Sequence, residues 1–140
     1  MKKTVICIVS TAAVFVLATA LNIQNMIWGG TPSVLGLVFS LVFCACLFVL
    51  PVVAKNRAFA VVSACFAAFS AIASTAGLLA VKGIISDTLA LVAVPPLTAF
   101  CGLSYIMSDY SVFYSVLIAF TLIAALNLIL TARKTAAAKA

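Results

Sequence analysis

The stretch 88–107 reads TLALVAVPPLTAFCGLSYIM. Hydropathy alone predicts a membrane span here, because an α-helix needs about 20 mainly apolar residues to cross the hydrocarbon core. Its centre, however, is Pro95-Pro96. Two adjacent prolines remove two backbone donors and disfavour helix at the residue before them. Whether this stretch crosses the membrane decides between a bundle of four helices and a bundle of five.

The composition of the whole chain indicates a membrane protein. Of 140 residues, 67% are hydrophobic and 7% are charged, whereas soluble domains carry about 45–50% apolar and about 25% charged residues. We therefore expect one integral membrane domain, with the lipid bilayer as its immediate partner. The net charge of +6 does not indicate a nucleic-acid partner, because the basic residues occupy short gaps between apolar runs and form no stripe with interleaved aromatics.

Four other apolar runs are long enough to span a membrane. We predict transmembrane helices at 4–23, 33–54, 58–81 and 112–131, followed by a basic tail at 132–140. Polar residues at 22–25 and turn-forming residues at 28–32 predict the first connection. The first run also resembles a secretory signal peptide with a cleavage site at Ala18-Thr19-Ala20, so whether it is removed stays open.

The positions of the basic residues favour four spans over five. If 88–107 does not cross, seven basic residues lie on one side of the membrane and only Lys82 lies on the other. If it does cross, the eight basic residues divide four against four. Cytoplasmic loops carry an excess of Lys and Arg, so the first arrangement is preferred. It predicts a multi-pass protein of the cell (inner or plasma) membrane with both termini in the cytoplasm.

The fold class expected from this topology is an all-α membrane protein, a four-transmembrane-helix bundle. Residues 84–111 then form an apolar re-entrant or broken-helix segment on the outer side, between the third and fourth spans. Trp and Tyr are enriched at membrane interfaces, and four spans place every Trp and Tyr of the chain at the outer interface. These residues are Trp28, Tyr105, Tyr110 and Tyr114.

The residue types that are missing argue against an enzyme. The chain has no His and no Glu, and its only acids are Asp87 and Asp109. Sites for metals that require imidazole or clustered carboxylates therefore cannot be assembled from one chain, and neither can a paired-carboxylate or His-based catalytic site. All five cysteines lie in apolar runs, which is not typical of a disulfide framework. We expect no cofactor and no metal.

Polar, aromatic and proline residues near the outer side are the candidates for a substrate site or pore, together with one Asn inside the last span. Broken helices place half-helix ends and free carbonyls at membrane depth, which is how many transporters build their sites. The alternative is that these residues are interfacial anchors, loop caps and interhelical hydrogen-bonding groups. The candidates are Asn25, Trp28, Asp87, Pro95, Pro96, Thr98, Tyr105, Asp109 and Asn127.

Small residues recur at helical spacing on two of the predicted spans, where they let helix backbones approach closely. The pattern predicts either packing inside the bundle or an oligomer interface. It comprises Ser63, Ala67, Ala71 and Thr75 on the third span, and Gly36 and Ser40 on the second.

The function expected from these features is transport, by a homo-oligomer or by a subunit of a larger membrane complex, because four helices alone enclose little space. The scarcity of acids favours a neutral, apolar or anionic substrate over a multivalent cation. Two alternatives stay open. One is a non-transporting accessory or scaffolding subunit, and the other is a membrane enzyme or lipid-handling protein.

Overall fold

The computed structural model describes residues 2–86, 94–107 and 109–138. Its helices are α1 (Lys2–Trp28), α2 (Val34–Ala54), α3 (Arg57–Val81), α5 (Val94–Thr98) and α6 (Tyr110–Ala137), with the 3₁₀ helix η2 (Cys101–Ile106) before α6. In these residues four helices, α1, α2, α3 and α6, are long and apolar enough to cross a membrane. The chain therefore has the features of a multi-pass, all-helical membrane protein.

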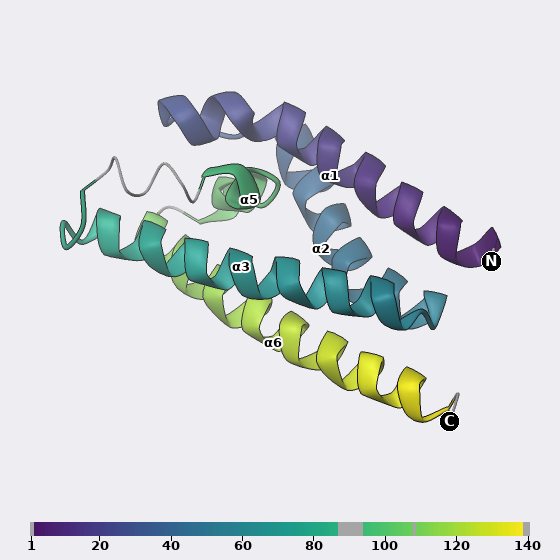
Figure 1. The fold of residues 1–140 in the computed structure, drawn as a ribbon. Coiled ribbons are helices and arrows are strands. Elements are labelled where there is room, and N and C mark those ends of the chain that lie inside the picture. Colours follow the sequence, from purple (N-terminus) through teal and green to yellow (C-terminus); the bar gives the residue numbers. More distant parts are fainter. Residues whose placement is uncertain (1, 87–93, 108, 139–140) are drawn as a thin grey trace.

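The four long helices alternate in direction, so both ends of the chain lie at the same end of the bundle (Figure 1). We call this the terminal end; it also holds the turn between α2 and α3. The opposite, far end holds the link between α1 and α2 and the start of α6. Of the described basic residues, only Lys82 lies at the far end. Those at the terminal end are Lys2, Lys3, Lys55, Arg57, Arg133 and Lys134.

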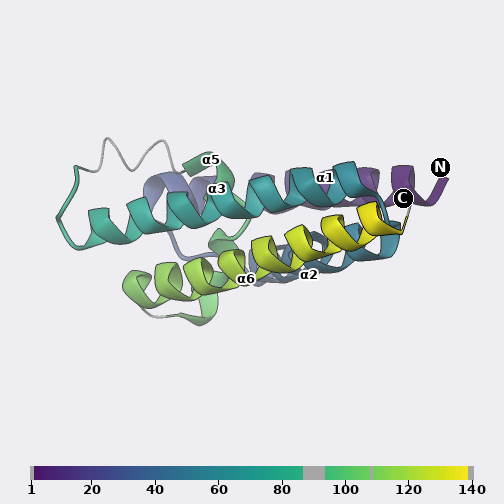
Figure 2. The same cartoon turned by 60° about the horizontal axis from the view of Figure 1, so that its bottom comes forward.

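The long helices pack as two pairs. The closest and longest contacts join α3 to α6 and α1 to α2, while contacts between the pairs are sparser. Near the far end the short helix α5 lies between α1 and α3, and η2 packs mainly against α2 (Figures 1 and 2). This short segment therefore joins two helix pairs that contact each other only in part.

Each helix start has a local cause in the sequence. The side-chain oxygens of Ser33, Asn56 and Asp109 accept hydrogen bonds from backbone N–H groups in the first turns of α2, α3 and α6. Such N-caps satisfy donors that have no partner inside the helix. At the other end of α1, Gly29 has φ +70°, the left-handed geometry that commonly follows a helix.

The described part of the proline-containing stretch is interrupted, but not at Pro95-Pro96 as the sequence predicts. Both prolines lie in the first turn of α5, where a missing N–H costs no helical hydrogen bond. Helix α5 ends at Thr98, and η2 begins only at Cys101. The two residues between α5 and η2 form a turn. Residues 88–93 of this stretch lie outside the described residues, as does the candidate Asp87.

One expected turn is wrong. Residues 22–25 do not form a polar connection, because α1 continues to Trp28. The prediction treated Asn22 as a turn residue, but its side chain is fully buried and hydrogen-bonded inside the bundle. Helix α6 also runs past the predicted boundary at 131 to Ala137. Its last turns contain Ala, a strong helix former, and Lys134, whose charge suits a helix C-terminus.

Candidate functional site

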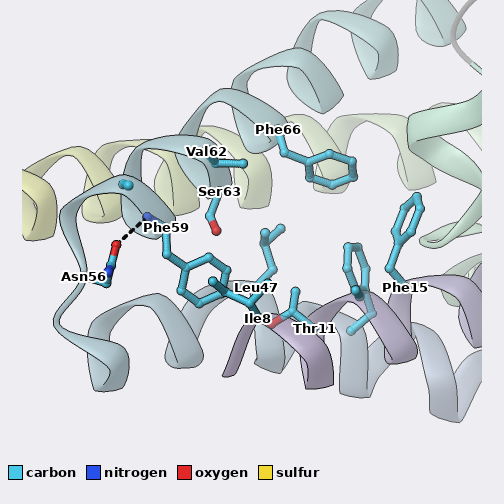
Figure 3. Close-up of a pocket in the computed structure, with 12 residues that line it drawn as sticks. Ile8, Thr11, Phe15, Leu47, Asn56, Phe59, Val62, Ser63 and Phe66 are labelled. Carbon is cyan, nitrogen blue, oxygen red and sulfur yellow. Dashed lines mark hydrogen bonds between the residues drawn. The ribbon is translucent and has the colours of Figure 1, made fainter. Parts of the chain in front are cut away.

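An apolar groove of about 600 Å³ lies between α1, α2 and α3, in the half of the bundle nearer the terminal end. Its α1 wall is formed by residues at helical positions i, i+3, i+4 and i+7, and its α3 wall repeats this spacing (Figure 3). That spacing places them on one face of each helix. The wall residues are Ile8, Thr11, Ala12 and Phe15 on α1, and Phe59, Val62, Ser63 and Phe66 on α3; Phe43, Leu47, Asn56 and Ala58 complete the lining.

No charged side chain is among the residues that line this groove. Two of its polar side chains already have backbone partners. The Thr11 hydroxyl donates to the Cys7 carbonyl at 2.8 Å, and the Asn56 oxygen accepts from the Phe59 N–H at 3.0 Å (Figure 3). A ligand in the groove therefore meets mainly aromatic rings and aliphatic groups, the environment that favours a neutral, apolar molecule.

Phenylalanines close the inner end of the groove. The Phe15, Phe43 and Phe66 rings lie 5.4–6.0 Å apart between centroids, in tilted or edge-on pairs. Phe100, which follows α5, lies 5.2 Å from Phe43 and 6.5 Å from Phe120 of α6. We call these five residues the phenylalanine cluster. It joins all four long helices and separates the groove from α5 and η2.

Hydrogen bonds hold the α5–η2 segment against α1 and α2. The Asn22 Nδ2 donates to the carbonyls of Ala18 and Gly36 and to the Ser40 hydroxyl, over 2.8–3.3 Å. The Ser40 hydroxyl in turn donates to the Ala99 carbonyl at 2.7 Å. Asn22, Ser40 and Ala99 are all completely buried. The Ala99 carbonyl, which faces no helical donor, is thereby paired inside the protein. Backbone polar groups at membrane depth require such a partner.

Close backbone packing supports the same attachment. A methyl group added at Gly102 of η2 would overlap the Gly36 carbonyl of α2, and it would also lie 2.6 Å from the Ser40 hydroxyl oxygen. Only glycine leaves room for η2 at this distance from α2. Gly36 and Ser40, predicted as packing or oligomer-interface residues, therefore make contacts within one chain.

The remaining small-residue positions on α3 divide between two environments. Ser63, Ala67 and Ala71 are buried, and Ala67 packs against Ala124 of α6. Thr75 is exposed, and its hydroxyl donates to the Ala71 carbonyl. Three of these four positions thus serve packing inside the bundle, which leaves Thr75 on an open surface.

The predicted substrate or pore residues do not form one site. Tyr105 lines a second cavity, of about 340 Å³, at the far end, together with Tyr110 and the 29–32 link. Asn25 lies beside Gly30 of that link, whereas the Trp28 side chain is 83% exposed. Asp109 is exposed and caps α6.

The other predicted site residues lie apart from that far-end cavity. Thr98 and Pro96 are buried, Pro95 is exposed, and the Thr98 hydroxyl donates to the Val94 carbonyl. Asn127 is half-buried on α6. The structure therefore brings a subset of the outer residues together, and the larger groove is lined by none of the predicted substrate or pore residues.

Searches against protein-family models, curated proteins and solved structures find no match. Function must therefore be argued from the residues themselves. Among the described residues, no three His, Cys, Asp or Glu side chains are grouped so as to hold a metal ion.

We expect Asn22→Ala to lower the free energy of unfolding by about 0.6–1.7 kcal/mol, from the average to the largest contribution of a hydrogen bond between membrane helices. Gly102→Ala should cost about 1–3 kcal/mol, because overpacking forces the backbone to shift. Unfolding in mixed micelles measures both. Gln24→Ala, exposed on the same helix, and Gly83→Asn, at an open left-handed glycine, are the matched controls. Equal effects for Asn22→Ala and Gln24→Ala would contradict the attachment.

Proposed function

We propose that this chain is a transport-class membrane protein that binds a neutral, apolar molecule in the groove between α1, α2 and α3. The groove itself is the observation that carries the proposal. Its volume of about 600 Å³ falls within the range of small-molecule sites, roughly 300–1,000 Å³. Its lining lacks charge, so a charged substrate would lose its hydration there without gaining a partner.

The asymmetry of the bundle supports transport over simple storage. One half of the interior is open as the groove, and the other half is filled by α5 and η2. The phenylalanine cluster is a steric barrier between them, formed by rings packed against one another, because an apolar surface alone stops water and ions but not an apolar molecule. In this proposal the groove is the open side of the pathway, and the α5–η2 segment blocks the other side as a re-entrant element.

The attachment of α5–η2 is suited to a barrier that moves. Its polar links run through Asn22 and Ser40, and hydrogen bonds between membrane helices contribute only about 0.6 kcal/mol each on average. Displacing the segment would also separate Phe100 from Phe43 and Phe66, which it now contacts. Passage of a substrate therefore requires that the α5–η2 segment lose these hydrogen bonds and ring contacts, while the contacts between α3 and α6 stay intact.

We expect a neutral photoreactive probe, trifluoromethyl-phenyldiazirine, to label the groove saturably when the protein is held in lipid nanodiscs. Ala12→Trp should abolish the saturable labelling, because residue 12 lines the groove and a bulky ring there would fill it. Ala13→Trp, at the next and equally exposed position outside the lining, should leave it unchanged. Peptide mapping by mass spectrometry is the measurement. Non-saturable labelling at groove and lipid-facing positions alike would contradict the proposal.

The proposed orientation places both termini in the cytoplasm of a cell whose plasma or inner membrane holds the protein. Six described basic residues at the terminal end against Lys82 at the far end support it, because basic residues concentrate on the cytoplasmic side. A fluorescent protein fused after Ala140 should fluoresce, and an alkaline phosphatase fused there should be inactive. Active phosphatase would place the C-terminus outside and contradict the orientation.

The proposal further includes assembly into a homo-oligomer or a larger membrane complex. Helix α1 buries the smallest share of its surface among the four long helices, and many of its large apolar side chains are exposed. The surface of another protein would cover these exposed apolar side chains of α1 as effectively as lipid does. Mass measurement in mild detergent should show an assembly larger than one chain. A strictly monomeric particle without a partner would contradict this part.

An accessory subunit is the second candidate, and the exposed α1 face favours it. A scaffolding subunit needs a docking face but no ligand. It would therefore co-purify with a larger protein and show no saturable labelling in the groove, which separates it from the transport proposal.

A further inference from the structure

A second groove, of about 420 Å³, lies between α3 and α6 near the terminal end. Its walls are mostly alanine with one valine, one cysteine and one isoleucine, and its two charged residues are Arg57 and Arg133. It shares no lining residue with the groove between α1, α2 and α3. The two grooves therefore present different chemistry to a ligand.

The order of residues along each helix separates charge from apolar surface. Arg57 is the first residue of α3, and Val61, Ala64 and Ala68 follow it toward the middle of the bundle. Arg133 lies near the end of α6, and Ile129 lies one turn farther in. The arginines thus stand at the mouth of the groove, where a membrane helix meets the headgroups, and the floor extends into the apolar layer.

The charge at this mouth has no acidic counterpart among the described residues. Asp109, the acid that the structure describes, caps the opposite end of α6. No acidic residue occupies the first turn of α3, so the partial positive charge of that helix end adds to the charge of Arg57. An anion at the mouth would compensate both the charge of Arg57 and the partial positive charge of the α3 N-terminus.

We propose that this groove binds an anionic phospholipid, with its phosphate between Arg57 and Arg133 and an acyl chain along the apolar floor. Guanidinium groups bind phosphate oxygens in a bidentate manner, and basic pockets between transmembrane helices take anionic headgroups. A free phosphate would match the arginines but leave the apolar floor uncovered. A zwitterionic lipid would cover the floor but add a positive choline beside two arginines. The site depends on membrane residence and not on transport.

Native mass spectrometry of the delipidated protein, titrated with phosphatidylglycerol or phosphatidylcholine, tests this assignment. We expect one phosphatidylglycerol to bind in preference to phosphatidylcholine. Arg57→Gln and Arg133→Gln should each weaken it about five-fold, because each basic residue near a membrane surface contributes about that factor. Lys2→Gln with Lys3→Gln, which removes two charges at the terminal end where each arginine variant removes one, should keep the wild-type affinity. Equal binding of the two lipids, or an equal loss in the lysine control, would overturn the proposal.

A second pair of variants tests the shape of the groove without changing charge. Ala136 lines the mouth, whereas Ala137 is its exposed neighbour on the last turn of α6. Ala136→Trp should abolish phosphatidylglycerol binding, and Ala137→Trp should not. Millimolar inorganic phosphate should fail to displace the lipid. Displacement by phosphate alone, or unchanged lipid binding in Ala136→Trp, would show a simple anion site and overturn the assignment to a lipid.

Discussion

Backbone that leaves helical geometry between membrane helices must find its hydrogen-bond partners within the protein, and this constraint organises the bundle. The chain stops being helical after Thr98, and the Ala99 carbonyl is paired by the Ser40 hydroxyl. Ser40 is in turn held by Asn22. The N–H groups of Phe100 and Leu103 find carbonyls three residues earlier, at 2.9 Å in both cases. The interruption that follows α5 is thus supported by polar groups on two other helices.

The same break explains why the bundle has an open half. Because α5 lies between α1 and α3 near the far end, these two helices are held apart there. Phe100 joins α2, α3 and α6 through the rings of Phe43, Phe66 and Phe120. Toward the terminal end nothing in the described chain fills the space, and it becomes the groove beside Phe15 and Phe66. Aromatic pairs contribute about 0.5–1.5 kcal/mol beyond burial, so the phenylalanine cluster stabilises the bundle where the two halves meet.

The sequence was sufficient for the four membrane-length helices, which the long apolar runs predicted. It also predicted an interruption at Pro95-Pro96, whereas both prolines lie inside α5 and that helix ends at Thr98. The sequence was misleading at Asn22. A polar residue near the end of an apolar run resembles a turn residue when its hydrogen-bond partners, here Gly36 and Ser40, are unknown. Those partners belong to another helix, so local pattern could not supply them.

The groove was harder to predict for a related reason. In a soluble helix the buried face is apolar and the exposed face is polar, but α1 and α2 carry large apolar side chains on their exposed faces as well. The series Phe59, Val62, Ser63 and Phe66 has the right spacing for one wall, yet neighbouring faces of α3 look equally apolar. Only the packing of α5 between α1 and α3, and of η2 against α2, decides which faces are left without a protein neighbour.

Charge, by contrast, distinguishes the two grooves in a way that hydropathy does not. Both are lined mostly by apolar atoms, and both open in the half of the bundle that carries most of the basic residues. One is lined without any charge, and the other ends in Arg57 and Arg133. An unpaired charge in an apolar environment is costly, so an uncharged molecule matches the first groove and an amphipathic anion matches the second. Two adjacent grooves on one small bundle can therefore select different ligands, because α3 faces α1 and α2 with phenylalanines and faces α6 with alanines and an arginine.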